Sequence, residues 1–201
     1  MQQVTTNKKY EPVALGCSHT AGTGVEIDQC YVSVLSRMIN KNIKNLAIGG
    51  GNASTNQDLL VKLLRYNRPK FVIAQWPNPI RLTLWSGEVS RLENINSCSA
   101  AFKELLKQSL ENFYQPWLKA IITCDLLCKQ KDIPILHILL EDIPPKYNQI
   151  LIANDITLHV DEKIPGKTWL FDSGAKDKSH HSAYCHNQWA ERICGLLNEI
   201  T

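Results

Sequence analysis

The sequence predicts an α/β fold, a three-layer α/β/α sandwich around a parallel sheet of about five strands. Three observations predict it. Short apolar runs alternate with longer stretches of helical periodicity. The run over residues 133–140 is almost continuously apolar, as parallel strands covered on both faces are. Polar or glycine-rich turns follow three of the runs, where such sheets bind ligands. With 201 residues, 44% of them hydrophobic, we expect one domain over 1–201.

The strands are expected where apolar, β-branched and aromatic residues gather between turn-forming residues. These runs are 12–17, 44–48, 71–76 and 133–140, with a last short strand over 169–171. Each strand is separated from the next by a helix or a long loop, so the connections are right-handed crossovers. This alternation favours a flavodoxin-like strand order.

The helices are expected where apolar residues recur every three to four positions. These stretches are 27–39, a helix that Ser54 caps, 100–129 and 181–200. Pro116 is expected to kink or interrupt the third of them.

Three segments are expected to lie outside the core. Residues 1–10 form a polar tail, and residues 78–96 are too irregular for a core element, so they are interpreted as a rim over the strand ends. Residues 141–167 are expected to be mostly loop, because Pro144-Pro145 and Pro165-Gly166 punctuate them.

Composition excludes several classes of partner. The net charge is +3 and the basic residues are scattered, so no nucleic-acid footprint is expected. Residues 1–9 lack the apolar core of a signal peptide, and no stretch approaches the ~20 apolar residues of a membrane span. We therefore expect a cytoplasmic protein without a membrane partner. The seven cysteines are odd in number and lie in apolar stretches, which indicates reduced core thiols.

The stretch Val13–Gly22 organises the chain, because a strand runs there into a tight turn with Ser18 at its tip. The first turn of the following helix offers unpaired N–H groups and a favourable dipole, so an oxyanion could form beside the serine hydroxyl. The alternative is that Ser18 merely caps a helix.

A second group lies near the other end of the chain. Asp177 and His180 are three positions apart, close enough in a turn for the carboxylate to orient the imidazole toward a serine. Ser18, Gly50 and Asn78 each follow a different strand, so they meet at one edge of the sheet.

Four residues are candidates for substrate contact. Arg81, flanked by Trp76 and Trp85, could clamp an anionic or sugar-like substrate. Alternatively, its stem lies on a tryptophan at the surface. His19 is interpreted as a rim residue, although it could replace His180 as the base.

No metal or cofactor is expected. His180, His181 and His186 form a cluster, but their spacing fits no common zinc pattern. The glycines at 49–51 lack the Gly-Lys-Ser/Thr that a nucleotide loop requires.

Four short blocks together resemble the SGNH (GDSL-type) hydrolases, in order and in separation, over nearly the whole chain. The first block, typically Gly-Asp-Ser, reads Gly16-Cys17-Ser18. The others are Asn45–Gly50, Trp76-Pro77-Asn78-Pro79 and Asp177–His180, with His186 and Ala190 in the helix that follows. The chain departs from the family pattern at Cys17, Trp76 and Pro79.

The resemblance implies an SGNH hydrolase fold and a serine esterase. Ser18 would be the nucleophile, His180 the general base and then acid, and Asp177 the orienting carboxylate. The backbone N–H groups of Ser18 and Gly50 and the Asn78 amide would form the oxyanion hole.

The substrate implied by the family is a small-molecule or carbohydrate ester, for example an O-acetyl group on a sugar. Two other functions stay open. An O-acyltransferase would use the same triad, and a binding or assembly module with impaired chemistry would explain the three departures. The sequence does not predict an oligomeric state.

Overall fold

The structure is a computed structural model that describes residues 11–79, 81–86, 89–94, 110–139, 143–160, 175–176 and 180–200, with the backbone alone over 81–86 and 89–94 and at residues 110, 160 and 200. Its centre is a five-stranded sheet in which every paired strand is parallel. The strand order is β2-β1-β3-β6-β7, which confirms the flavodoxin-like order. The strands are β1 (Val13–Leu15), β2 (Lys44–Asn45), β3 (Val72–Trp76), β6 (Ile135–Leu139) and β7 (Leu158–Val160).

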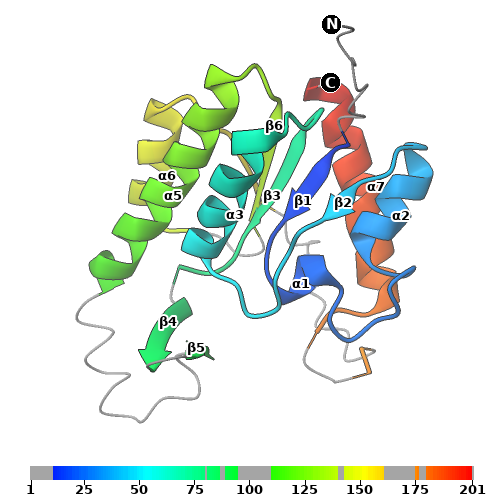
Figure 1. The fold of residues 1–201 in the computed structure, drawn as a ribbon, viewed down its shortest axis with the longest axis horizontal. Coiled ribbons are helices and arrows are strands. Elements are labelled where there is room, and N and C mark those ends of the chain that lie inside the picture. The colour runs from blue at the N-terminus through cyan, green and yellow to red at the C-terminus, as the bar shows by residue number, and fades with distance from the viewer. Residues whose placement is uncertain are drawn as a thin grey trace, which may run out of the picture.

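Helices cover both faces of this sheet, so the predicted three layers are present (Figure 1). On one face, α2 (Tyr31–Met38) packs against α7 (Ala183–Ile200). On the other, α5 (Leu110–Gln130) packs between α3 (Ala53–Tyr66) and α6 (Pro145–Ala153). The core is accordingly divided into two apolar clusters, one on each side of the sheet.

The segment predicted to be loop, 141–167, contains both α6 and β7. This prediction was wrong because Pro145 occupies the first turn of α6, where the missing N–H of a proline costs no hydrogen bond. β7 pairs with β6 at the sheet edge, with Leu158 opposite His137. The strand predicted at 169–171 lies outside the described residues.

The helix boundaries also differ from those predicted. α2 begins at Tyr31 rather than at residue 27. α3 is capped by Asn52, not by Ser54: the Asn52 side chain accepts from the Thr55 N–H, and the Thr55 hydroxyl oxygen accepts from the Asn52 N–H. α5 continues through Pro116, so the expected interruption does not occur.

The predicted rim, residues 78–96, holds an antiparallel hairpin of β4 (Arg81–Ser86) and β5 (Val89–Asn94). This hairpin forms a two-stranded sheet apart from the central one, beyond the end of β3 (Figure 1). The described part of this segment is therefore regular, contrary to the expectation of an irregular rim, and its strands pair apart from the central sheet.

Six of the seven cysteines lie in the described part of the chain, and all six are free thiols, five of them buried. Burial raises the pKa of Cys128 to about 12 and also raises that of Cys30, so these thiols stay protonated and inert. The expectation of reduced core thiols is confirmed for these six. Among the described helices, none is both long enough and apolar enough to cross a bilayer.

Candidate active site

Ser18 lies where the sequence places it, at the start of a short helix directly after β1. Helix α1 (Ser18–Ala21) has Cys17 as its N-cap and ends at Gly22 in the left-handed conformation, with φ 80°. The turn is tight: a Cβ on Gly16 would lie 2.2 Å from Thr20 Oγ1, so only glycine fits there. Ser18 is 8% exposed, so this residue lies almost entirely beneath the molecular surface.

The glycine loop after β2 lies beside this turn. The Ile48 N–H donates to the Gly16 carbonyl at 3.2 Å, and a Cβ on Gly51 would lie 3.5 Å from the same oxygen. Gly50 has a φ of 77°, a backbone conformation that residues with a side chain rarely adopt. Within the described residues, the backbone N–H groups of Ser18 and Gly50 donate no hydrogen bond. Two of the predicted oxyanion donors therefore belong to adjacent loops.

The end of the chain returns to the same turn. The ring centroids of His19 and His180 are 5.3 Å apart, and those of His19 and His181 are 4.6 Å apart. Figure 1 shows α1 beside the segment that leads into α7. The structure thus brings His180 to the helix that begins with Ser18. Asp177 lies outside the described residues.

Asn78 follows β3 at the same edge of the sheet. β3 pairs with β1, with Ala74 opposite Leu15, so the chain leaves both strands side by side. The turn between β3 and Asn78 is fixed by the Trp117 indole N–H, which donates to the Pro77 carbonyl at 2.8 Å. Asn78 itself is partly exposed.

The candidates for substrate contact fall into different places. Trp76 is 1% exposed, and its indole donates to His137 Nδ1 at 3.0 Å, so this side chain belongs to the core and the predicted substrate contact by Trp76 is wrong. Arg81 and Trp85 lie in β4, where their side chains are outside the description. His19 is partly buried against His180 and His181.

A buried polar network that the sequence analysis missed continues from Trp76. Because the indole is only a donor, His137 Nδ1 must accept, and Nε2 carries the proton toward Asp125 Oδ1 at 3.3 Å. Asp125 Oδ2 also pairs with Lys129 Nζ at 2.9 Å. Burial raises the pKa of Asp125, but the hydrogen bonds from His137 and Lys129 outweigh it, so the pKa lies below its ordinary value.

Replacing Asp125 by asparagine is expected to destabilise the fold at pH 7 by about 2 kcal/mol, because charge-assisted bonds to a buried carboxylate are lost. The folded-state pKa is depressed, so this stabilisation is present above the unfolded pKa of about 3.9 and disappears as the pH falls through the folded value. The difference between wild type and variant in urea unfolding should therefore narrow on acidification. Asp132→Asn is the control, because Asp132 is 91% exposed and pairs loosely with Arg68. A constant difference across pH would contradict the assignment.

His186 is a structural histidine. It is fully buried and accepts the Tyr31 N–H at Nδ1, 3.2 Å away. Burial, and then the neighbouring His181 and His180, lower its pKa to about 4, so it is neutral near pH 7. Over the residues that the structure describes, no three histidine, cysteine or acidic side chains are grouped to hold a metal ion.

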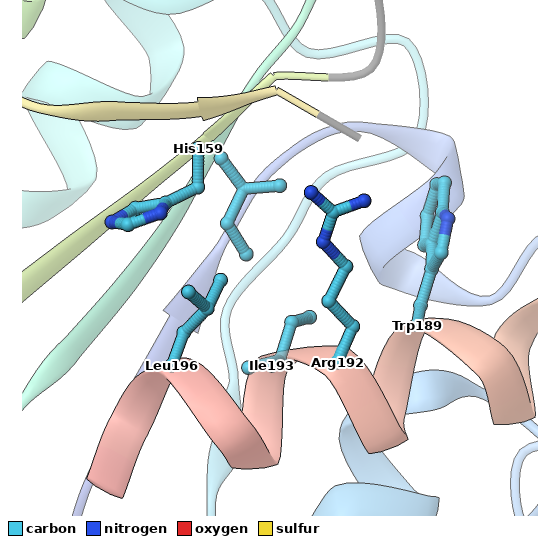
Figure 2. Close-up of a pocket in the computed structure, with 6 residues that line it drawn as sticks. His159, Trp189, Arg192, Ile193 and Leu196 are labelled. Atoms are coloured by element: carbon cyan, nitrogen blue, oxygen red, sulfur yellow. The ribbon is translucent and has the colours of Figure 1, made fainter. Parts of the chain in front are cut away.

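A small groove lies beside the histidines, between α7 and strands β6 and β7. Figure 2 shows Arg192 rising from α7 between His159 and Trp189. Trp189 also packs on His181, with ring centroids 4.9 Å apart. This indole is therefore shared by the groove and the histidine cluster. The groove is lined mainly by apolar side chains, namely Ile138, His159, Trp189, Arg192, Ile193 and Leu196.

No protein-family model matches the chain, and no curated protein matches it in sequence. Solved structures do match it in fold. The psychrotrophic esterase EstA from Pseudoalteromonas sp. superposes with a TM-score of 0.60 at 14% identity, over 94% of this chain and 97% of EstA. A protein assigned to the lipolytic G-D-S-L family from Desulfitobacterium hafniense gives 0.58 at 15% identity, over 92% and 98%.

The acetyl xylan esterase Est2A from Butyrivibrio proteoclasticus gives a TM-score of 0.55 at 10% identity, over 95% of this chain and 64% of Est2A. At such identities the likeness is one of fold. It agrees with the strand order and with the four sequence blocks. The chain therefore has the fold of the SGNH hydrolases, as its motifs predict.

Proposed function

We propose that the chain is a serine esterase in which Ser18 is the nucleophile and His180 the general base. The observation that carries this proposal is the approach of His180 to α1, with its ring 5.3 Å from that of His19, the residue next to Ser18. Ser18 and His180 come from opposite ends of the chain, so the approach of His180 to α1 is not a consequence of sequence proximity. Asp177 is assigned as the carboxylate that orients His180, on the sequence motif alone.

In the proposed reaction, Ser18 Oγ attacks the ester carbonyl carbon while His180 takes the hydroxyl proton. The tetrahedral intermediate collapses, and His180 returns that proton to the departing alcohol. Water then attacks the acyl-enzyme while His180 takes one of its protons; the second tetrahedral intermediate collapses, His180 returns that proton to Ser18 Oγ, and the carboxylic acid is released. The full cycle needs no cofactor.

The negative charge of the intermediate would be held by the N–H groups of Ser18 and Gly50 and by the Asn78 amide. Both backbone donors make no other hydrogen bond in the described part of the chain, which supports this role. Fixed donors of this kind act without reorganisation during the reaction, and each is worth about 3 kcal/mol in the transition state.

Two of the three departures from the family pattern lie away from the reacting groups. Cys17 and Trp76 are both buried, and their side chains face the core rather than Ser18 Oγ. This placement favours an active enzyme over an impaired binding module. For the substrate we propose a short acyl ester on a carbohydrate, which the similarity to an acetyl xylan esterase supports.

The test is covalent labelling with a fluorophosphonate probe, followed by peptide mass spectrometry and an assay on p-nitrophenyl acetate. The proposal expects the label on Ser18 and equal release of nitrophenol and acetate. In a second assay, a sugar acceptor is added together with p-nitrophenyl acetate. If Ser18 is labelled by the probe but this assay yields an acetylated sugar instead of free acetate, the protein is a transferase. The absence of any label on Ser18 in folded protein would refute a serine enzyme.

A further inference from the structure

We infer that Gln75 is a positioning residue whose side-chain oxygen fixes the turn that carries Ser18. This inference rests on the proposed function. Gln75 lies one residue before the end of β3 and is 1% exposed, so it touches no substrate. A polar side chain this deep in a parallel sheet requires an explanation.

The oxygen of Gln75 gathers three donors from the nucleophile turn. Oε1 accepts from the Cys17 N–H at 3.1 Å, from Cys17 Sγ at 3.2 Å and from Thr20 Oγ1 at 3.1 Å. Cys17 and Thr20 flank the pair Ser18-His19 on either side. A single atom of β3 therefore ties both ends of the segment that presents the nucleophile.

The orientation of the Gln75 amide is dictated by these donors. A backbone N–H can only donate, so the oxygen and not the NH₂ group must face Cys17. The Thr20 hydroxyl donates its proton to Gln75 Oε1, so the Tyr31 hydroxyl, 3.2 Å from Thr20 Oγ1, must be the donor to Thr20. These hydrogen bonds therefore have one direction: Tyr31 donates to Thr20, and Thr20 donates to Gln75.

The same orientation leaves the Gln75 NH₂ group without a hydrogen-bond acceptor among the described residues. Its nitrogen Nε2 is buried, and a buried donor left unpaired costs about 1–3 kcal/mol. A hydrophobic residue at this position would remove that donor but would leave the Cys17 N–H and the Thr20 hydroxyl without their shared acceptor. The glutamine is therefore explained by what its oxygen does for the turn.

Gln75 also takes over one half of a capping box, because it accepts the backbone N–H of the N-cap residue Cys17. Cys17, the N-cap of α1, makes no side-chain hydrogen bond to the helix. In a capping box, a side chain at the third helical position accepts the N-cap N–H; here Thr20 holds that position and Gln75 accepts in its place. Because the cap comes from β3, the Ser18 turn is fixed relative to the strand that leads to Asn78.

The experiment compares Gln75→Leu, which keeps the volume but removes the acceptor, with Asn56→Ala. Asn56 is fully buried and donates to the Gln75 backbone carbonyl at 2.9 Å, so it probes the same region without touching the turn. Gln75→Leu should lower kcat about 10- to 100-fold with KM changed less than about twofold, since a displaced nucleophile slows chemistry and not binding. Asn56→Ala should lower the melting temperature but leave kcat per folded molecule unchanged.

Thr20 supplies a second, milder test should Gln75→Leu fail to fold. Thr20→Val removes the hydroxyl that donates to Gln75 and is expected to lower kcat, whereas Thr20→Ser keeps it and should retain the wild-type kcat. Equal kcat in Thr20→Val, Thr20→Ser and wild type would overturn the inference.

The two proposals fail differently. If wild-type protein takes no fluorophosphonate on Ser18, the esterase itself is refuted. If wild type is labelled, and folded Gln75→Leu is labelled at the same rate with the same kcat, only the positioning role is refuted. If kcat falls equally in Gln75→Leu and Asn56→Ala, the positioning role is also refuted, because Gln75 would then act only through the stability of the region.

Discussion

Replacing Ser18 by alanine is expected to reduce the hydrolysis of p-nitrophenyl acetate by at least about 10³-fold in kcat, because no acyl-enzyme can form. The hydroxyl is small and 8% exposed, so its loss should leave the fold intact, with an unchanged melting temperature. The measurement is the initial rate at saturating substrate, after subtraction of spontaneous hydrolysis.

Ser33→Ala is the matched control. Ser33 lies on α2 and its hydroxyl donates to the Ile27 carbonyl, so this variant removes a serine hydroxyl and one hydrogen bond outside the proposed machinery. Ser33→Ala should hydrolyse the ester at the wild-type rate. Should Ser18→Ala do the same, another group carries the chemistry and the triad assignment falls.

The second large effect is expected at His180. His180→Ala should lose about as much kcat as Ser18→Ala, because a nucleophile and its base act as a unit, and the double variant should be hardly worse than either single one. His19→Ala tests the competing base, since His19 is adjacent to Ser18 in sequence and packs against His180.

We expect His19→Ala to keep a measurable rate and a wild-type response to the fluorophosphonate probe. Its ring is in contact with both His180 and His181, so a modest loss of kcat is expected from loosened packing. The reverse order, with His19→Ala inactive and His180→Ala active, would move the base to His19.

The sequence predicts the central sheet well because its strands are buried on both faces. β1, β3 and β6 consist of apolar runs between turn-forming residues, and all three appear within one or two residues of the predicted positions. β2 is an edge strand only two residues long, with both residues exposed, although Leu46 and Ile48 of its apolar continuation still donate to the Ala14 and Gly16 carbonyls.

The missed elements have weak patterns. α6 begins on a Pro-Pro pair that also fits a loop, and β7 has only three residues, Leu158–Val160. In both cases packing on neighbouring elements decides the structure: Tyr147 and Leu151 of α6 are buried in the cluster that α5 shares. Local periodicity over so few residues cannot carry that information.

The candidate site divides in the same way. The motifs predict Ser18, Gly50 and Asn78 at one edge of the sheet, and in the structure they follow β1, β2 and β3, while the ring of His180 lies near that of His19 on α1. Gln75 is not predicted, because its role depends on a partner strand. The available signal is a polar residue inside the apolar run 71–76, and the same signal marks His137 within β6.

The cysteine at position 17 becomes understandable once Gln75 is known. The family pattern has an aspartate there, and a carboxylate would face the Gln75 oxygen with no proton to share. A thiol can donate to that oxygen, and Sγ lies 3.2 Å from it. The departure in the first block and the glutamine in the third strand are thus parts of one arrangement.

The docking of α7 on α2 has a consequence for biogenesis. His180 immediately precedes α7, so the imidazole reaches α1 only when this last helix has closed the layer over the sheet. Contacts between such distant segments form late, since the intervening loop entropy must be overcome first. If the proposed function is right, reactivity toward esters would therefore appear no earlier than the docking of α7, late in folding.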